Sequence, residues 1–158
     1  MARIDLPEGT EDESLRLLSL QPSMGNAMAV LTAAIYSKSG LDIRVREAVR
    51  MRIAQLNQCH ICLQFRFPEL EKNGINEAFY KALDNWHDNP TFSEKEKLAI
   101  EYTERFILDH LSIDELFMDK LKDHFSAKET FELTYTIAGL LANGRTLQVL
   151  QVDQVCSL

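Results

Sequence analysis

Apolar residues recur at the spacing of a helix face along most of the chain. The clearest stripe is Leu98, Tyr102, Phe106 and Leu111. No stretch between turn signals alternates apolar and polar residues with a period of two, so no sheet is expected. The pattern predicts an all-α protein of about seven or eight helices, over residues 11–20, 24–39, 42–56, 60–73, 76–86, 94–110, 113–124 and 127–152.

Local signals predict where these helices begin and end. A hydroxyl residue followed three positions later by glutamate forms a capping box, in which side chains satisfy free backbone N–H groups at a helix start. We expect four of them, at Thr10/Glu13, Ser93/Glu96, Ser112/Glu115 and Ser126/Glu129. Gly40 and Gly74 follow helical segments and are expected to close them in the left-handed conformation.

The last helical segment differs from the others in its distribution of apolar residues. From about Ala127 to Val152 these residues lie around much of the helix circumference. A helix at the surface of a globular protein normally has one apolar stripe. The segment is therefore expected to be central in the fold or to face another subunit.

Composition and charge exclude several classes of function. The chain has 158 residues, of which 46% are hydrophobic and 26% charged, and we expect one soluble domain over residues 1–158. A net charge of −7 without a local basic patch argues against a nucleic-acid partner. No apolar run approaches the ~20 residues of a membrane span, and the acidic N-terminal segment does not resemble a signal peptide. We expect a cytoplasmic protein with no membrane partner.

The stretch CHICLQFR, residues 59–66, has the most distinctive chemistry. Cys59 and Cys62 lie three residues apart at the predicted start of a helix, where free N–H groups and the helix dipole favour a thiolate. This spacing suits reversible dithiol–disulfide chemistry. Two alternatives remain: the cysteines are small core residues, or they are half of a zinc site that needs two further ligands. Cys156 has no partner in the sequence, and we assign it no role.

A longer segment around these cysteines resembles a known family. LDIRVREAVRMRIAQLNQCHICLQFRFPELEKNGI resembles the core of the carboxymuconolactone decarboxylase/alkylhydroperoxidase D (AhpD) superfamily, with Glu47 twelve residues before Cys59, then Cys62 and Gly74. Downstream, FSEKEKLAIEYTERF and FSAKETFELTYTIAGLLANGRTLQVLQV resemble the peroxidase-related branch. The resemblance covers about residues 23–152, which leaves residues 1–22 as an N-terminal helical extension.

The resemblance implies an AhpD-like helical domain that assembles into homo-oligomers such as trimers or hexamers. By position, Cys62 would be the peroxidatic cysteine, Cys59 the resolving cysteine and Glu47 part of a proton relay. The implied partners are a hydroperoxide substrate and an external dithiol reductant, with no bound cofactor or metal. Asn143 and Arg145 resemble a small motif on the last helix of the family, which we interpret as packing or subunit contact.

Two positions depart from the family pattern. Arg66 replaces a relay histidine, and Ile61 stands where some members have a second histidine. A guanidinium can stabilise a nearby thiolate, but it stays protonated and cannot shuttle a proton. His60 is an alternative proton donor. Pro68 is expected to kink or restart the helix and to turn Arg66 away from the thiols, because it lacks an N–H and clashes with the carbonyl of Gln64.

Glu47 also has a purely structural interpretation. Arg44 and Arg50 each lie three residues away, so an ion pair along the helix would account for the glutamate. We favour the proton relay, because the spacing to Cys59 matches the family and a carboxylate near thiols has an evident role in proton transfer.

Three functions are compatible with these features. The first is a thiol-dependent alkylhydroperoxidase-like antioxidant enzyme that cycles Cys59 and Cys62 between dithiol and disulfide, with Arg66 in the place of the relay histidine. The second is a lyase of the carboxymuconolactone decarboxylase type, which would not need the cysteine pair. The third is a non-catalytic helical oligomer that senses redox state or uses its cysteines only for packing, and Arg66 and Pro68 support it best. We favour the peroxidase.

Overall fold

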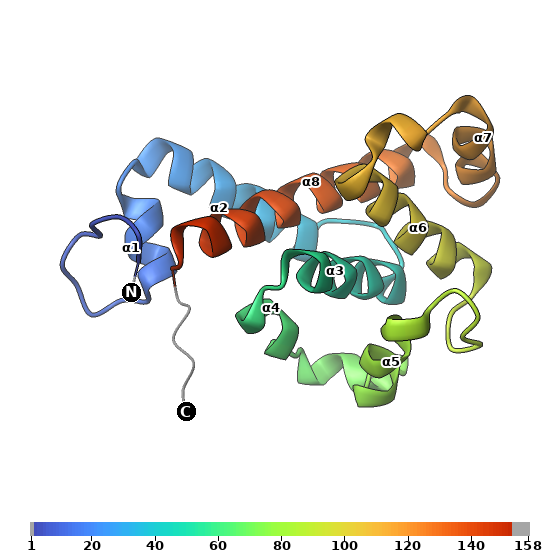
Figure 1. Cartoon of the computed structure of the whole chain (residues 1–158), viewed down its shortest axis with the longest axis horizontal. Helices are drawn as coiled ribbons and strands as arrows, with labels where there is room; N and C mark the ends of the chain where they lie inside the picture. Colours follow the sequence, from blue (N-terminus) through green and yellow to red (C-terminus); the bar gives the residue numbers. More distant parts are fainter. Residues whose placement is uncertain (1, 153–158) are drawn as a thin grey trace.

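The computed structural model describes residues 2–152, and this part of the chain is helical with no strand (Figure 1). Its α-helices are α1 (Glu13–Ser19), α2 (Pro22–Ser37), α3 (Ile43–Asn57), α4 (His60–Gln64), α5 (Glu77–Ala82), α6 (Glu94–Leu108), α7 (Glu115–His124) and α8 (Ala127–Leu150). Short 3₁₀ helices are η1 (Pro68–Asn73), η2 (Leu83–Asn85) and η3 (His110–Ser112). The all-α prediction is confirmed.

Helix α3 is the centre of the fold. It packs against α6 and α8, while α2 runs beside α8 (Figure 1). Two apolar clusters lie on different faces of α3. One includes Val45 and Val49 with residues of α6, α7 and α8, and the other includes Ala48 and Met51 with residues of η1, α5 and α6. Because both clusters depend on α3, this helix holds its side chains in fixed positions for the site described below.

Helix α8 is less buried than its sequence suggests. Phe131, Tyr135 and Val149 are exposed, and the expectation that this segment is central is wrong because α3 takes that place. The other expectation, that it faces a second subunit, stays a prediction. Within residues 2–152, neither α8 nor any other helix has the length and apolarity of a membrane span.

Two of the four predicted capping boxes are present. Ser93 with Glu96 starts α6, and Ser126 with Glu129 starts α8. The predictions at Thr10 and Ser112 are wrong, because an aspartate stands directly before each of those helices. At α7 the Asp114 carboxylate accepts a hydrogen bond of 2.8 Å from the backbone N–H of Phe117 and so replaces the expected serine.

Of the two glycines that were expected to end helices, only one does so. Gly74 closes η1 in the left-handed conformation with φ 71°, as expected. The expectation for Gly40 is wrong: α2 ends at Ser37, and Gly74 is the only glycine of the described chain with positive φ. The Gly40 N–H instead donates to the Glu132 carboxylate at 2.8 Å, which ties the α2–α3 connection to α8.

The expected helix over residues 60–73 is broken in the middle. Helix α4 ends at Gln64, Phe65 is extended, and Pro68 starts η1 at the first helical position. The restart predicted from Pro68 is therefore confirmed, and the single helix is wrong. Because α4 has only five residues, its dipole stabilises a thiolate less than that of a helix over residues 60–73 would.

Candidate active site

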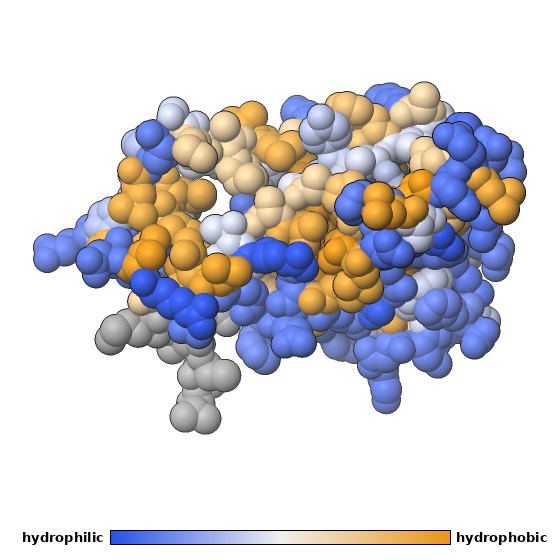
Figure 2. Space-filling view, turned by 45° about the horizontal axis from the view of Figure 1, so that its top comes forward, coloured by the Kyte–Doolittle hydropathy of each residue, from blue (hydrophilic) through white to orange (hydrophobic). Residues whose placement is uncertain are grey.

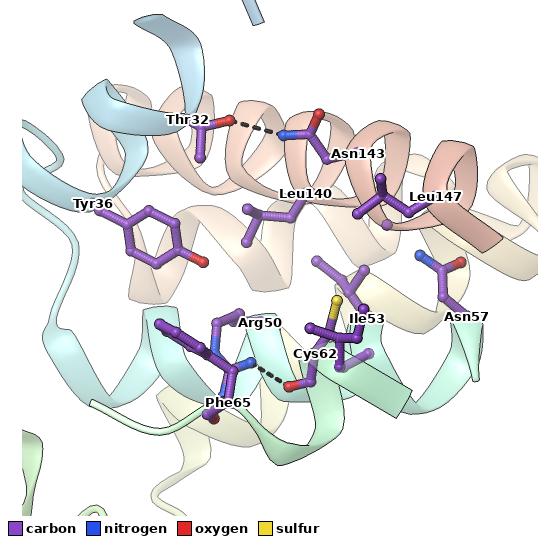
Figure 3. Close-up of a pocket in the computed structure, with 13 residues that line it drawn as sticks. Thr32, Tyr36, Arg50, Ile53, Asn57, Cys62, Phe65, Leu140, Asn143 and Leu147 are labelled. Carbon is purple, nitrogen blue, oxygen red and sulfur yellow. Dashed lines mark hydrogen bonds between the residues drawn. The ribbon is translucent and has the colours of Figure 1, made fainter. Parts of the chain in front are cut away.

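Cys59 and Cys62 form a disulfide at the start of α4, and their Cα atoms are 5.2 Å apart. The two cysteines differ in exposure. Cys59 is fully buried, whereas Cys62 is partly exposed and lines a cavity (Figure 3). A molecule that enters the cavity therefore meets Cys62 first.

The turn before Cys59 places this pair. Gln58 has φ 51°, and the N–H groups of Gln58 and Cys59 donate to the carbonyls of Gln55 and Ala54 at 3.1 Å each. This is a Schellman motif with glutamine where glycine is usual. Cys59 then caps α4, because its Sγ accepts from the N–H of Cys62 at 3.4 Å. The sequence gives no clear sign of this turn, since the left-handed residue is not glycine.

The cavity has a volume of about 200 Å³ and lies between α2, α3, α4 and α8 (Figure 3). Most of its wall is apolar, with Ile53, Phe65, Leu140 and Leu147 among the lining residues. Its polar side chains are Thr32, Tyr36, Arg50, Asn57 and Asn143. Such a space suits a small organic molecule held mainly by apolar contact and presented to one sulfur atom.

Glu47 lies in a buried network beside the cysteine turn. Its side chain is 2% exposed and accepts two hydrogen bonds from Arg50, at 2.6 and 2.9 Å. The Tyr80 hydroxyl donates to the same carboxylate at 2.8 Å. Burial, followed by the charge of Glu47, raises the pKa of Tyr80 to about 12, so this hydroxyl remains a donor at neutral pH.

Arg50 connects this network to the cysteine turn. Besides Glu47, its guanidinium donates to the carbonyl of Cys62 at 2.8 Å and to that of Phe65 at 3.2 Å. Burial acts to lower the pKa of Arg50, but hydrogen bonds and charge from Glu47 outweigh it and raise that pKa, so the guanidinium stays charged. From the sequence alone, Arg50 is expected only to form an ion pair with Glu47. Its position three residues after Glu47, on the same helix face, was the available signal.

Arg66 and His60 do not line the cavity. The Arg66 guanidinium pairs with the Glu77 carboxylate at 2.6 Å and lies 4.0 Å from the centre of the Tyr80 ring. It also donates to the carbonyl of Leu63 at 2.6 Å. His60 is exposed. The structure thus places Cys59, Cys62, Glu47 and Arg50 together, with Arg66 over the Tyr80 ring and not at the cavity.

Asn143 and Arg145 join α8 to its neighbours. The Asn143 amide donates to the Thr32 hydroxyl at 2.8 Å, and Arg145 donates to the side-chain amide oxygen Oδ1 of Asn57 at 3.1 Å. A Cβ atom on Gly144 would come within 3.0 Å of the Asn57 amide nitrogen, so glycine permits α8 to approach the end of α3. These contacts support the packing interpretation of the two residues.

The alternative of a zinc site finds no support in residues 2–152. In that range no three side chains of histidine, cysteine, aspartate or glutamate are grouped as metal ligands. The two cysteines are joined to each other instead.

A family model and bacterial relatives match this chain. The model of the carboxymuconolactone decarboxylase family matches residues 22–105. Uncharacterized protein YnjA of Escherichia coli is 34% identical over 101 residues, which are 63% of this chain and 55% of YnjA. The chain therefore spans about half the length of that relative. Uncharacterized protein YdfG of Bacillus subtilis is 27% identical over 105 residues, covering 65% of this chain and 71% of YdfG.

Solved structures share the fold at low sequence identity. An uncharacterized peroxidase-related protein from a Silicibacter species superposes with a TM-score of 0.78 at 14% identity, covering 96% of this chain and 90% of that one. The alkylhydroperoxidase AhpD core of a peroxidase-related protein from Ralstonia eutropha gives a TM-score of 0.76, also at 14% identity, over 96% and 91% of the two chains. The fold is therefore AhpD-like.

Proposed function

Because the chain belongs to the carboxymuconolactone decarboxylase family and joins an AhpD-like fold to a CxxC disulfide, we propose that it is a thiol-dependent hydroperoxide reductase. Its substrate is an organic hydroperoxide, and its reductant is an external dithiol. A lyase of the decarboxylase type does not need the cysteine pair, and a redox sensor does not need a substrate cavity beside its cysteines.

The observation that carries this proposal is the unequal placement of the two sulfurs. Cys62 faces an apolar cavity, and Cys59 is buried directly behind it within bonding distance. A peroxidatic cysteine must meet the substrate, whereas a resolving cysteine has to reach only the oxidised sulfur. The roles expected from the family resemblance thus agree with the exposure of each residue.

The chemistry balances with these two thiols and one reductant. The Cys62 thiolate attacks the terminal oxygen of the hydroperoxide, the O–O bond breaks, and Cys62 becomes a sulfenic acid while an alkoxide leaves and takes up a proton. The Cys59 thiol then attacks that sulfur, the disulfide forms, and the hydroxyl leaves as water. An external dithiol reduces the disulfide by exchange and is itself oxidised. The net products are an alcohol, water and an oxidised dithiol.

Glu47 and Arg50 have distinct parts in this cycle. Arg50 fixes the carbonyl of Cys62 and places a positive charge at the cavity wall, which favours the thiolate. Glu47, which Arg50 links to the cysteine turn, accepts the thiol proton and passes it on. The Arg66 charge is engaged by Glu77, so its contribution to the thiolate is smaller than that of Arg50.

A comparison of substrates tests the function directly. Reduced wild-type protein with cumene hydroperoxide and excess dithiothreitol is expected to consume the peroxide catalytically. The same protein with γ-carboxymuconolactone is expected to release no CO₂. Release of CO₂ without peroxide consumption would identify the lyase, and inertness in both assays would leave the non-catalytic oligomer.

The proposed enzyme is a cytoplasmic homo-oligomer. Helix α2 has no charged residue between Pro22 and Ser37, yet it exposes Met24 and Val30, and apolar side chains gather over the α1–α2 end in Figure 2. Contiguous apolar surface of this kind favours association with a second copy. Light scattering on the purified chain is expected to give a mass above that of the monomer, and a monomer at micromolar concentration would contradict the assembly.

A further inference from the structure

Tyr36, on α2, projects its hydroxyl into the cavity that Cys62 lines (Figure 3). Its ring is held by Phe67, whose centre lies 5.4 Å away, and by the Arg46 guanidinium at 5.8 Å. The hydroxyl has no hydrogen-bond partner among residues 2–152. The Tyr36 hydroxyl therefore faces the Cys62 sulfur across a mostly apolar cavity, and its proton is not already donated to another group of the protein.

Hydroperoxide reduction needs such a donor. When the O–O bond breaks, the alkoxide must be protonated, because a free alkoxide in an apolar cavity is strongly disfavoured. At the family's relay position, Arg66 is paired with Glu77 and lies over the Tyr80 ring, and a guanidinium does not take the part of a histidine in proton transfer. His60 is exposed and does not line the cavity.

The other hydroxyl groups nearby are already engaged. Thr32, which also lines the cavity, donates to the carbonyl of Met28 at 2.9 Å and accepts from Asn143. Tyr80 donates to Glu47. Of the hydroxyl groups that line the cavity, Tyr36 has the one that remains available.

We propose that Tyr36 is a catalytic residue that donates the proton to the alkoxide leaving group and thereby replaces the missing relay histidine. This inference rests on the hydroperoxide reductase function proposed above. The Tyr36 O–H bond breaks as the new alcohol O–H bond forms. The resulting phenolate is reprotonated by the proton that Cys62 released on ionisation, so the cycle requires no additional reactant.

The surroundings of Tyr36 suit this role. Burial raises the pKa of Tyr36 above its usual value, so the hydroxyl stays protonated at neutral pH. A phenol is still a much stronger acid than the alcohol that the alkoxide becomes, so proton transfer runs downhill. The Arg50 guanidinium on the same cavity wall acts to stabilise the phenolate.

The test uses leaving groups of different basicity. Reduced wild type and Tyr36→Phe are mixed in single turnover with tert-butyl hydroperoxide and, separately, with peracetic acid, and the rate of disulfide formation is measured. tert-Butoxide must be protonated as it leaves, whereas acetate is stable without a proton. Tyr36→Phe is expected to slow the reaction with tert-butyl hydroperoxide about 100-fold, the usual contribution of a general acid, and to leave the peracetic acid rate nearly unchanged.

The outcomes separate this inference from the function on which it rests. Equal slowing with both oxidants would show a structural role for Tyr36, and unchanged rates with both would show another donor; each overturns the inference while the peroxidase stands. A wild type that forms no disulfide with either oxidant overturns both. Tyr135→Phe, at an exposed position on α8, is the matched control, and circular dichroism melting verifies that each variant is folded.

Discussion

Replacement of Cys62 by serine is expected to abolish hydroperoxide reduction, whereas Cys59→Ser is expected to react once and then stop. Serine at position 62 leaves no thiolate at the cavity, since Cys59 is fully buried. With Cys59 replaced, Cys62 still attacks the peroxide but no buried thiol resolves the sulfenic acid. Both predictions are measured as the peroxide consumed per protein molecule without added reductant. Wild type and Cys59→Ser are each expected to use about one equivalent, and Cys62→Ser is expected to use none.

The reverse pattern would contradict the assignment of roles. If Cys62→Ser still consumed one equivalent and Cys59→Ser consumed none, Cys59 would be the attacking residue. Both variants remove one disulfide, so their difference cannot come from lost stability alone. The comparison of the two therefore controls for the cross-link itself.

Arg50→Met is expected to lower the free energy of unfolding by about 3–5 kcal/mol, because it leaves a buried carboxylate unpaired. Glu47 and Arg50 are 2% and 5% exposed, so neither group can turn to solvent for a new partner. The loss is a large part of the about 5–15 kcal/mol that stabilises a domain. Urea unfolding at neutral pH, monitored by circular dichroism, measures it.

Two further variants distinguish the buried pair from ordinary ion pairs. Glu47→Leu combined with Arg50→Met removes both charges and is expected to recover much of the stability while peroxidase activity stays low. Lys122→Met breaks an exposed pair with Asp119 at the same three-residue spacing and is expected to have little effect. A double variant no more stable than Arg50→Met would show that packing, and not the unpaired charge, sets the cost.

Helix content was predictable from apolar spacing, but the central helix was not. Helix α8 is the more apolar of the two and was expected at the centre, whereas α3 carries four arginines and a glutamate. Helix α3 is nevertheless buried, because Glu47 pairs with Arg50 and because Arg44 and Arg52 reach carboxylates on α6. A hydropathy pattern counts these residues as polar and cannot anticipate that their charges are paired.

The cysteine pair and Glu47 could be found from the sequence because they lie in one continuous motif. Tyr36 and Tyr80 could not, since they come from other helices and nothing in their local sequence indicates that they meet Glu47 or Cys62. The spacing of Arg66 along one helix would let it stabilise the Cys62 thiolate, whereas Pro68 was expected to turn it away from the thiols. That helix ends at Gln64, and the arginine pairs with Glu77 on α5 instead.

Trapping of the sulfenic acid identifies the cysteine that attacks the hydroperoxide. Cys59→Ser and Cys62→Ser, each in a Cys156→Ser background, are reduced, treated with one equivalent of cumene hydroperoxide in the presence of dimedone, and analysed by peptide mass spectrometry. We expect a dimedone adduct on Cys62 in the first protein and none on Cys59 in the second. An adduct on Cys59, or unmodified Cys62 after the peroxide treatment, would contradict it.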